Sequence, residues 1–330
     1  MDRITIADVA KRAGVSISSV SYALSNKRPI KEETRQKIQQ AIRDLGYRPN
    51  QSAKRLASKE KTRNIGFVMP LQGSELTGLE MKFISGAAKA INEADYTFIL
   101  LAHSDRNPEN LLRFARNGVV DGFILMEVYM QDERVELLKQ EGLPFVLIGR
   151  CGDTAGLHYV DMDVEQGMEL GFSQLKALGH GSIAYLYKDD PNFGLAVRSL
   201  QEYQAACKRH KIPLMTQSCR LTAEDGEAAM NALLDRQPGI NAALVWNEIP
   251  ALGAARAVQS RGRRIPDDFS IICLVQSSTS NNANFAPVII DIQAEKVAAE
   301  AAQLLIALLE DRPVNTPHIL IPPRLITGPD

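Results

Sequence analysis

The sequence lacks the features that mark membrane-spanning, disulfide-bonded and metal-binding proteins. No apolar run approaches the roughly 18 residues that a membrane-spanning helix needs. The cysteines lie far apart with no C-x-x-C pair, so they predict reduced thiols rather than a zinc site or a disulfide framework. They are Cys151, Cys207, Cys219 and Cys273. The chain starts with Asp2 and Arg3 and has no apolar leader, so we expect no secretory signal and a cytoplasmic location.

Signatures of common catalytic sites are also missing. The sequence contains no phosphate-binding glycine loop, no G-x-S-x-G turn and no set of His and Cys at metal-ligand spacing, and it has only five histidines. With 45% hydrophobic residues over 330 positions, the composition is otherwise that of a globular chain of two or three domains. We therefore predict a protein that is not an enzyme and that uses no cofactor or metal.

Charge divides the chain into two unlike parts. Residues 1–63 contain 15 Lys and Arg against 6 Asp and Glu, whereas residues 64–330 contain 23 basic and 33 acidic side chains. The total of −1 thus conceals a basic head and an acidic body. A basic head favours binding to nucleic-acid phosphates, although charge alone does not separate DNA from RNA or from an anionic membrane.

Residues 5–25 predict two short helices joined by a tight turn. The apolar side chains of the first helix recur at i, i+3, i+4 and i+7, and they are Ile6, Val9, Ala10 and Ala13. Gly14 ends this helix, and Ser16 is a suitable N-cap for a second one. Such a pair forms a helix-turn-helix, whose second helix can enter the DNA major groove. Because any small helical domain can contain such a pair, the argument depends on the uncharged outer side chains Ile17, Ser18, Ser19 and Tyr22.

Two further segments follow within the basic head. A third helix is indicated by the apolar residues Ile38, Ala41, Ile42 and Leu45, with Gly46 as its C-cap. After Pro49 comes a helical piece of eight residues, 50–57. Helices of fewer than about 12 residues are marginal alone in water, so we expect this piece to fold only on a partner.

The head resembles the DNA-binding domain of the lactose-repressor family of bacterial regulators. The family pattern T-I-x-D-V-A-x-x-A-G-V-S-x-x-x-V-S is satisfied over residues 5–21. A second pattern, R/K-x-x-I-x-x-A-I-x-x-L-G-Y-x-P-N, is satisfied over residues 35–50, and the hinge pattern A-x-x-L by Ala53 and Leu56. The resemblance implies an all-α helix-turn-helix head and hinge helix, followed by a two-lobed α/β domain similar to periplasmic sugar-binding proteins.

The resemblance also implies how the head binds DNA. The recognition helix would dock in the major groove, while the hinge helices of a dimer enter the minor groove. Leu56 would be the apolar wedge that unstacks a central base step, the alternative being a core leucine that packs on the next domain. Tyr22 stands where many members carry a base-contacting Arg, so the operator sequence should differ. The predicted DNA-contacting residues are Thr5, Ser16, Ile17, Ser18, Ser19, Tyr22, Arg28, Thr34, Tyr47, Asn50, Ala53, Lys54 and Leu56.

From residue 64 the sequence alternates between buried strands and helices. Continuous apolar strands separated by helices predict parallel sheets covered on both faces, and the number of elements suits two doubly wound lobes. The strand candidates are 65–69, 97–101, 122–126, 145–148, 183–187, 242–246 and 270–274. The longest helical patterns include 79–94 and 164–178.

Motifs similar to those of the family's effector domain recur along this body, at residues 120–122, 160–163, 178–180, 247–253 and 265–270. Ligands in such folds bind where polar side chains converge at the carboxyl ends of strands. The predicted effector-binding residues are Gln72, Arg150, Asp161, Asp163, Phe193, Arg198, Trp246, Asn247 and Gln276. For each of them the alternative is a salt bridge, a helix cap or core packing.

The expected roles of these side chains follow from their chemistry. Arg150 could present a fork of donors to sugar hydroxyls, a carboxylate or a phosphate. Asp161 and Asp163 would accept hydrogen bonds from hydroxyls, and the Asn247 amide would both donate and accept. Phe193 and Trp246 could offer an apolar face to a sugar ring.

Two departures from the family pattern bear on the effector. Aligned on Tyr203, the pattern R-x-x-G-Y/F has Ser199 at its Arg position, with Arg198 one place early. The G-F/Y-D-D turn has Val275 where a ligand-binding Asp is usual. A small carbohydrate is the main hypothesis for the effector, and a non-sugar or lost effector is the alternative. A soluble sugar-binding transport protein is disfavoured by the basic head and the missing signal.

We expect residues 1–49 to form the DNA-binding domain, 50–63 the hinge helix and linker, and 64–330 the effector-binding and dimerisation domain. The expected lobes are lobe 1, at about residues 64–160 and 291–320, and lobe 2, at about 161–290 with the C-terminal end.

The predicted function is that of a repressor of sugar or carbon metabolism genes, switched by a small-molecule effector. One hinge helix cannot fold alone and two DNA half-sites need two heads, so a homodimer on a palindromic double-stranded operator is expected. The sequence has no heptad tail for a tetramer. We expect the protein to be nucleoid-associated, with no membrane partner.

Overall fold

The structure is a computed structural model that describes residues 4–25, 28, 30–47, 61–70, 76–103, 107–274 and 288–326. The chain separates into two compact units, Met1–Lys61 and Thr62–Asp330. Each unit has its own hydrophobic core and is described by itself.

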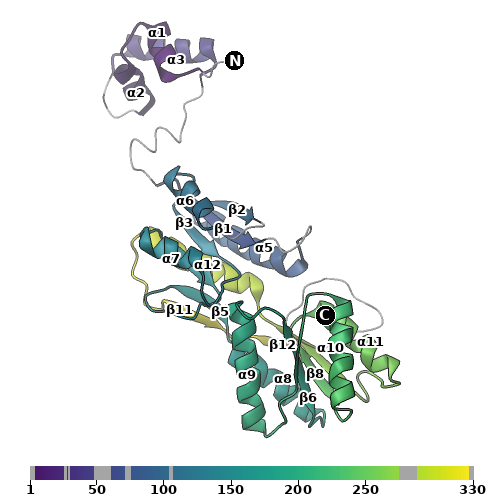
Figure 1. The fold of residues 1–330 in the computed structure, drawn as a ribbon. Helices are drawn as coiled ribbons and strands as arrows, with labels where there is room; N and C mark the ends of the chain where they lie inside the picture. Colours follow the sequence, from purple (N-terminus) through teal and green to yellow (C-terminus); the bar gives the residue numbers. More distant parts are fainter. Residues whose placement is uncertain are drawn as a thin grey trace. The chain divides into compact units, whose positions relative to one another are not determined.

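The first unit contains the three predicted helices, which are α1 (Ile6–Ala13), α2 (Ile17–Ser25) and α3 (Glu32–Leu45) (Figure 1). They enclose a small core made of Val9, Ala10, Val20, Ile38 and Ala41. The predicted hinge helix at residues 50–57, and most of the linker after it, lie outside the described residues.

The second unit begins at Thr62, which is bound to the residue that precedes a strand of the first sheet. The backbone N–H and the hydroxyl of Thr62 both donate to Asp121 Oδ1 at 2.8 Å. The backbone N–H of Arg63 donates to Asp121 Oδ2 at 2.6 Å. One carboxylate therefore fixes the first two residues of this unit.

The first sheet of the second unit has six parallel strands in the order β11-β5-β4-β3-β1-β2. These strands are β1 (Asn64–Pro70), β2 (Thr97–His103), β3 (Gly122–Leu125), β4 (Phe145–Ile148), β5 (Tyr159–Met162) and β11 (His318–Ile321). Strands β3 and β4 are buried throughout, as their continuous apolar sequences predict.

The second sheet also has six strands, in the order β12-β10-β9-β8-β6-β7. They are β6 (Ile183–Lys188), β7 (Thr216–Cys219), β8 (Ala242–Val245), β9 (Ser270–Cys273), β10 (Val288–Asp291) and β12 (Arg324–Ile326). Strand β12 runs antiparallel to β10, and the other pairs are parallel.

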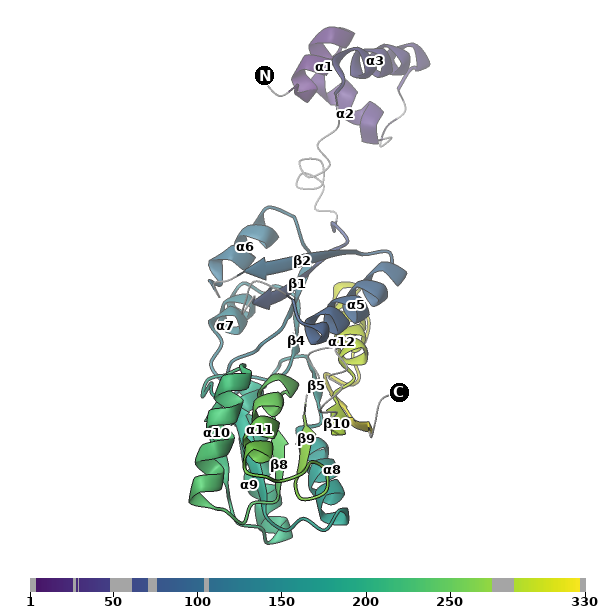
Figure 2. The same cartoon turned by 90° about the vertical axis from the view of Figure 1, so that its right-hand side faces the viewer.

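Helices cover both faces of each sheet, which makes the second unit a pair of α/β lobes (Figures 1 and 2). In lobe 1, α5 and α12 pack against one face and α6 and α7 against the other. In lobe 2, α8 and α9 cover one face and α10 and α11 the other. The bounds are α5 (Gly78–Glu93), α6 (Glu109–Arg116), α7 (Glu133–Gln140), α8 (Val164–Ala177), α9 (Gly194–His210), α10 (Ala223–Arg236), α11 (Glu248–Ser260) and α12 (Ala294–Leu309). The predicted two-lobed α/β fold is confirmed.

The chain passes between the lobes at three places. It leaves lobe 1 at Asp163, after β5, and returns to it at Gln293, between β10 and α12. It leaves again through Pro322 and Pro323, between β11 and β12. Two of these crossings touch, because the backbone N–H of Asp163 donates to Ile321 O at 2.9 Å. Strand β5 belongs to lobe 1 through Met162, two residues beyond the expected end of the first segment of lobe 1.

Candidate functional sites

The turn between α1 and α2 has the geometry that its sequence predicts. Gly14 lies in the left-handed region at φ 65°, where a glycine is favoured because it has no Cβ. The backbone N–H of Val15 donates to Ala10 O at 3.0 Å and closes the end of α1. The Ser16 hydroxyl accepts the backbone N–H of Ser19 at 3.1 Å, which makes Ser16 the N-cap of α2.

The outer face of α2 presents uncharged side chains to solvent. Ile17 is 52% exposed, and Ser16 and Ser18 are exposed beside it. The hydroxyls of Ser16 and Ser19 lie 2.8 Å apart, and the guanidinium of Arg28 lies 5.3 Å from the centre of the Tyr22 ring. Small and hydrogen-bonding side chains of this kind fit the major groove, where the base edges carry donors, acceptors and the thymine methyl.

The remaining predicted DNA-contacting residues of the head are placed as follows. Thr5 is exposed, and its backbone N–H and hydroxyl donate to Asp8 Oδ2 at 2.8 and 2.7 Å. These hydrogen bonds hold the pKa of Asp8 below its ordinary value. Thr34 and Tyr47 are half-buried, and Tyr47 packs against the core of the head. The predicted hinge contacts, Asn50, Ala53, Lys54 and Leu56, lie outside the described residues.

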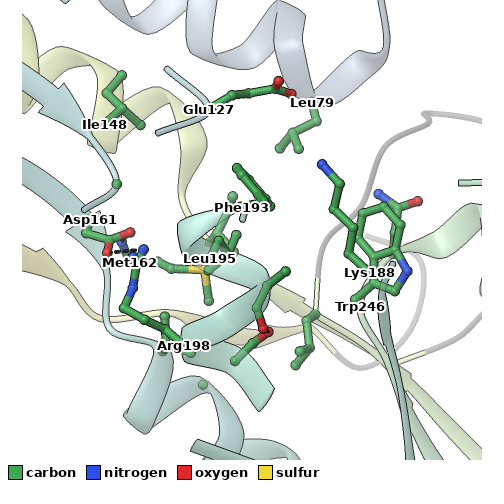
Figure 3. A pocket seen from close by; sticks show the side chains of 18 of the residues that line it. Leu79, Glu127, Ile148, Asp161, Met162, Lys188, Phe193, Leu195, Arg198 and Trp246 are labelled. Carbon is green, nitrogen blue, oxygen red and sulfur yellow. Dashed lines mark hydrogen bonds and ion pairs between the residues drawn. The ribbon is translucent and has the colours of Figure 1, made fainter. Parts of the chain in front are cut away.

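A cavity of about 270 Å³ lies between the two lobes of the second unit (Figure 3). Lobe 1 contributes the ends of β3, β4 and β5 and the start of α5, and lobe 2 contributes β6, α9 and the end of β8. The position agrees with the rule that ligands of parallel α/β folds bind at the carboxyl ends of strands.

Most of the wall of this cavity is apolar. The apolar lining residues of lobe 1 include Leu79, Phe83, Met126, Val128, Ile148 and Met162, and those of lobe 2 include Met168, Leu195, Ala196, Leu221 and Leu274. Such a wall favours a ligand with an apolar face, because polar groups that meet it lose their hydrogen bonds to water.

Asp161 is the acidic centre of the polar part of the wall. Its Oδ2 accepts from Arg150 Nε at 2.9 Å and from Arg198 Nη2 at 2.8 Å, and its Oδ1 accepts the backbone N–H of Met162. The Asp161 side chain is 6% exposed and that of Arg198 is 13% exposed. Burial lowers the pKa of the Arg198 guanidinium, and the Asp161 carboxylate acts in the opposite direction.

Ser199 takes the predicted Arg position of the family pattern, and its hydroxyl makes its hydrogen bonds within the protein. It accepts a hydrogen bond from the buried Tyr185 phenol at 2.9 Å and donates to Ala196 O at 3.0 Å. Burial raises the pKa of the Tyr185 phenol well above its ordinary range. This part of the wall is therefore neutral.

A lysine and two aromatic rings form another part of the wall (Figure 3). The ammonium of Lys188, at the end of β6, lies 3.9 Å from the centre of the Phe193 ring and 5.9 Å from that of Trp246. Cations attract the faces of aromatic rings, so the lysine holds these two side chains on one side of the cavity. The Trp246 indole also faces Cys219, whose pKa is raised to about 11 by burial.

The structure brings five of the predicted effector-binding residues into the wall of the cavity: Asp161, Phe193, Arg198, Trp246 and Asn247. Arg150 stands behind this wall as a partner of Asp161. Asn247 also has a structural role, since its Oδ1 caps α11 by accepting the backbone N–H of Ile249 at 2.9 Å.

Asp163 is not among the residues that line the cavity. Strand β5 ends at Met162, so Asp163 lies at the N-terminus of α8 and accepts the backbone N–H of Gln166 at 2.9 Å. The predicted residues Gln72 and Gln276, and Val275 of the altered turn, lie outside the described residues.

Sequence reasoning missed five polar residues of the wall: Thr77, Glu80, Glu127, Tyr185 and Lys188. Lys188 directly follows the predicted strand 183–187, and this signal could have identified it. Tyr185 lies within the run of four buried residues that begins β6, and its position inside this run gives no sign of a cavity.

The described ranges of the chain contain neither a metal-binding cluster nor a membrane-spanning helix. Within them, no group of three or more His, Cys, Asp or Glu side chains is placed to hold a metal ion. No helix in those ranges combines the length and the apolar character that crossing a membrane requires.

Comparison with protein families gives two matches. Residues 5–50 match the model described as bacterial regulatory proteins, lacI family. Residues 172–329 match the model of a periplasmic binding protein-like domain. The first match covers α1, α2 and α3, and the second covers most of lobe 2 and the C-terminal elements.

Individual proteins similar to the chain include the HTH-type transcriptional regulator AglR of Rhizobium meliloti (strain 1021). It is 30% identical over 275 residues, which are 82% of this chain and 77% of that protein. The fold is similar to the lac repressor dimer bound to operator and the anti-inducer ONPF, with a TM-score of 0.77 and 23% identity over 99% of this chain and 98% of that one. It is also similar to the complex of the transcriptional regulator CelR with cellobiose, with a TM-score of 0.74 and 24% identity over 98% and 99% of the two chains.

Proposed function

This chain belongs to the lacI family of bacterial regulatory proteins, and from that membership we propose that it represses transcription from a palindromic DNA operator, which it binds as a homodimer. The membership confirms the coarser predictions that the chain is a DNA-binding transcription regulator and that it is not an enzyme. In the proposed arrangement, residues 1–49 bind DNA, 50–63 form hinge and linker, and 64–330 bind effector and the second subunit.

The outer face of α2 is the observation that carries the proposal. Its exposed Ile17 and Ser18 are uncharged, and they lie on a head with a large excess of basic side chains. The basic residues supply affinity for phosphates, and the side chains of α2 supply contacts to bases. Tyr22 in place of a base-contacting Arg gives the operator its own sequence preference.

A homodimer is supported by the need for two heads on two half-sites. The hinge segment, too short to be helical alone, would fold where two copies meet on DNA. The lac repressor, whose fold this chain shares, has been solved as a dimer on its operator.

The cavity between the lobes is the proposed effector site, and a small carbohydrate is the first candidate. CelR, of similar fold, has been solved in complex with cellobiose. Asp161, Arg198 and Asn247 supply polar groups, and Phe193 and Trp246 supply aromatic ones. Effector binding would change the geometry of the lobes and hence operator affinity, with a coupling of roughly 1–3 kcal/mol in either direction.

A non-sugar effector is the second candidate, and the apolar wall favours it. Many lining residues are aliphatic or methionine, and the neutral Ser199 replaces a usual sugar-binding Arg. A compound with an apolar face and few hydroxyls would suit this wall better than a free hexose.

The proposal is tested by binding of the purified protein to DNA from around its own gene, at fixed salt. The complex is measured without addition, with a panel of sugars, and with a panel of small non-sugar metabolites. A specific palindromic site whose binding one sugar alters supports the first candidate, and a response only to a non-sugar supports the second. Binding without preference for any sequence would overturn the proposed repressor.

The wedge role of Leu56 is tested by Leu56→Ala. We expect specific operator binding to weaken much more than non-specific DNA binding, because only the specific complex contains the bent central step. Leu178→Ala, at a leucine that is 52% exposed on lobe 2, serves as the control. Equal losses of specific and non-specific binding in Leu56→Ala would rule out the wedge.

The effector role of Asn247 is tested by Asn247→Ser. Serine keeps an oxygen that can cap α11, and it removes the amide that would contact a ligand. We expect the effector response to fall while operator affinity without effector stays the same. Unchanged effector response would assign Asn247 to the cap alone.

A further inference from the structure

The two lobes are joined across the mouth of the cavity by backbone hydrogen bonds. The N–H of Met130, after β3, donates to Asn192 O at 2.8 Å, and the N–H of Gly194 donates to Val128 O at 3.0 Å. Between these two bonds, Tyr129 of lobe 1 forms an antiparallel bridge with Phe193 of lobe 2. Neither bond can persist when the lobes separate.

Gly194 allows the lobes to come this close. A Cβ on Gly194 would lie 2.4 Å from the carbonyl oxygen of Arg150 and 3.0 Å from that of Val128, both in lobe 1. Backbone atoms cannot move aside as a flexible side chain can, so any larger residue at the start of α9 would push the lobes apart.

Arg198 connects the lobes one turn further along α9. Its Nη1 donates to Arg150 O at 2.7 Å. Its Nη2 donates to Asp161 Oδ2 at 2.8 Å (Figure 3). Helix α9 belongs to lobe 2. Arg150 comes shortly after β4 and Asp161 lies on β5, and both strands belong to lobe 1. One guanidinium thus holds a carbonyl and a carboxylate of the opposite lobe.

This ion pair differs from the surface pairs of the protein in its burial. Arg198 and Asp161 are 13% and 6% exposed, whereas Arg220 of the pair with Asp225 is 75% exposed. Opening the lobes would break the Arg198 pair and leave Asp161 with Arg150, its guanidinium partner within lobe 1. The Nε of Arg198 is also buried and has no hydrogen-bond partner among the described residues.

We propose that Arg198 is a latch built into the chain, which holds the lobes closed without a ligand and sets the operator affinity of the ligand-free protein. The effect of Arg198 on operator affinity rests on the proposed function, whereas its effect on lobe closure does not. An effector that enters the cavity then acts on a cleft that is already closed, and competes with Asp161 and Arg150 for the same guanidinium.

The test compares hydrogen exchange in the full-length protein and three variants, without DNA or added compounds. Arg198→Gln removes the charge, Gly194→Ala introduces the steric conflict, and Arg220→Gln is the matched control within lobe 2. Peptides that contain the N–H groups of Met130 and Gly194 report closure, and peptides from β8 report the integrity of lobe 2.

We expect exchange in the closure peptides to rise roughly tenfold or more in Arg198→Gln and Gly194→Ala, and to stay unchanged in Arg220→Gln. Exchange in β8 should stay unchanged in all three. If Arg198→Gln loosens β8 as well, Asp161→Asn, which removes the charge from the other side of the same pair, takes its place. Unchanged exchange in the closure peptides of Arg198→Gln, or of Asp161→Asn where it takes its place, would overturn the latch. This holds even if Gly194→Ala opens the cleft.

Operator binding by the same variants tests the regulatory part. The affinity of ligand-free Arg198→Gln should differ from that of the natural chain by about 5-fold or more, with Arg220→Gln unchanged. Faster exchange in the closure peptides together with unaltered operator affinity would support the latch and refute its role in regulation. A natural chain that binds no operator would refute the proposed function, while the exchange result still decides the closure.

Discussion

The phenol of Tyr185 donates a 2.9 Å hydrogen bond to the hydroxyl of Ser199, in a place where both side chains are buried. The Ser199 hydroxyl in turn donates a hydrogen bond to Ala196 O. The sequence alignment on Tyr203 predicts that Ser199 stands at an Arg position of the family pattern, and the structure has a satisfied, neutral pair there. The two side chains depend on each other for their hydrogen bonds.

Replacing Ser199 by Ala should therefore destabilise the second unit. The Tyr185 hydroxyl would stay buried without an acceptor, at a cost of about 1–3 kcal/mol. Urea denaturation followed by far-UV circular dichroism measures the loss. Tyr185→Phe combined with Ser199→Ala should cost less than the two single changes added together, because no buried hydroxyl is left unpaired. Strict additivity would show that the two groups do not depend on each other.

Gly253 should not tolerate even a methyl group. A Cβ there would lie 1.7 Å from the carbonyl oxygen of Ala223, because α10 and α11 pack at this point through their backbones. Gly253→Ala should destabilise the second unit by about 3 kcal/mol, despite the better helix propensity of alanine. Gly239→Ala is the control, since a Cβ at Gly239 meets nothing within 4 Å. Equal stability of the two variants in urea would contradict the close packing.

Asp8 should make the stability of the head depend on pH. Hydrogen bonds from Thr5 lower the pKa of Asp8 in the folded state, so its stabilising effect is present at neutral pH and lost as the pH falls through that lowered value. Asp8→Asn should lower the thermal stability of the head at pH 7, and the difference from the natural chain should shrink toward about pH 3. Circular dichroism melts of the full chain across this range give the comparison. A difference that is constant with pH would exclude the carboxylate as its cause.

The cysteines should differ in their reactivity with iodoacetamide. Cys151 is half-buried, whereas Cys207, Cys219 and Cys273 are buried, and burial raises the pKa of the Cys219 thiol to about 11. At pH 8 we expect one label per native chain, at Cys151, and four after unfolding in urea. The Cys151 reaction itself should be slow, because burial raises its pKa too. Mass spectrometry locates the labels, and early labelling of Cys219 would argue against the described packing of β7.

The sequence predicted six of the eight interior strands, whose residues are mostly apolar, and missed the interior strands β5 and β10, each of which contains an Asp. Strand β4 (Phe145–Ile148) was predicted with its observed bounds, and β8 within one residue. Strand β7, with the sequence TQSC, was missed. It lies at an edge of its sheet and is half-buried over most of its length, so its residues carry no apolar pattern.

The site was predictable to the extent that strand ends carry polar side chains. Asp161 and Asn247 were found in this way, and both line the cavity. Asp163 was predicted to contact the ligand together with Asp161, but the strand ends between them and Asp163 caps a helix. The contacts of Arg198 depend on how closely α9 approaches lobe 1 at Gly194, and no local sequence pattern encodes that distance.

The hydrogen bonds of Thr62 and Arg63 to Asp121 have a mechanical consequence. Asp121 directly precedes β3, so these hydrogen bonds fasten the start of the second unit to lobe 1. When one lobe rotates against the other, the first two residues of the second unit, Thr62 and Arg63, therefore move with lobe 1. Thr62 and Arg63 therefore report the motion of lobe 1, and a displacement of lobe 2 is transmitted to them through the contacts between the lobes.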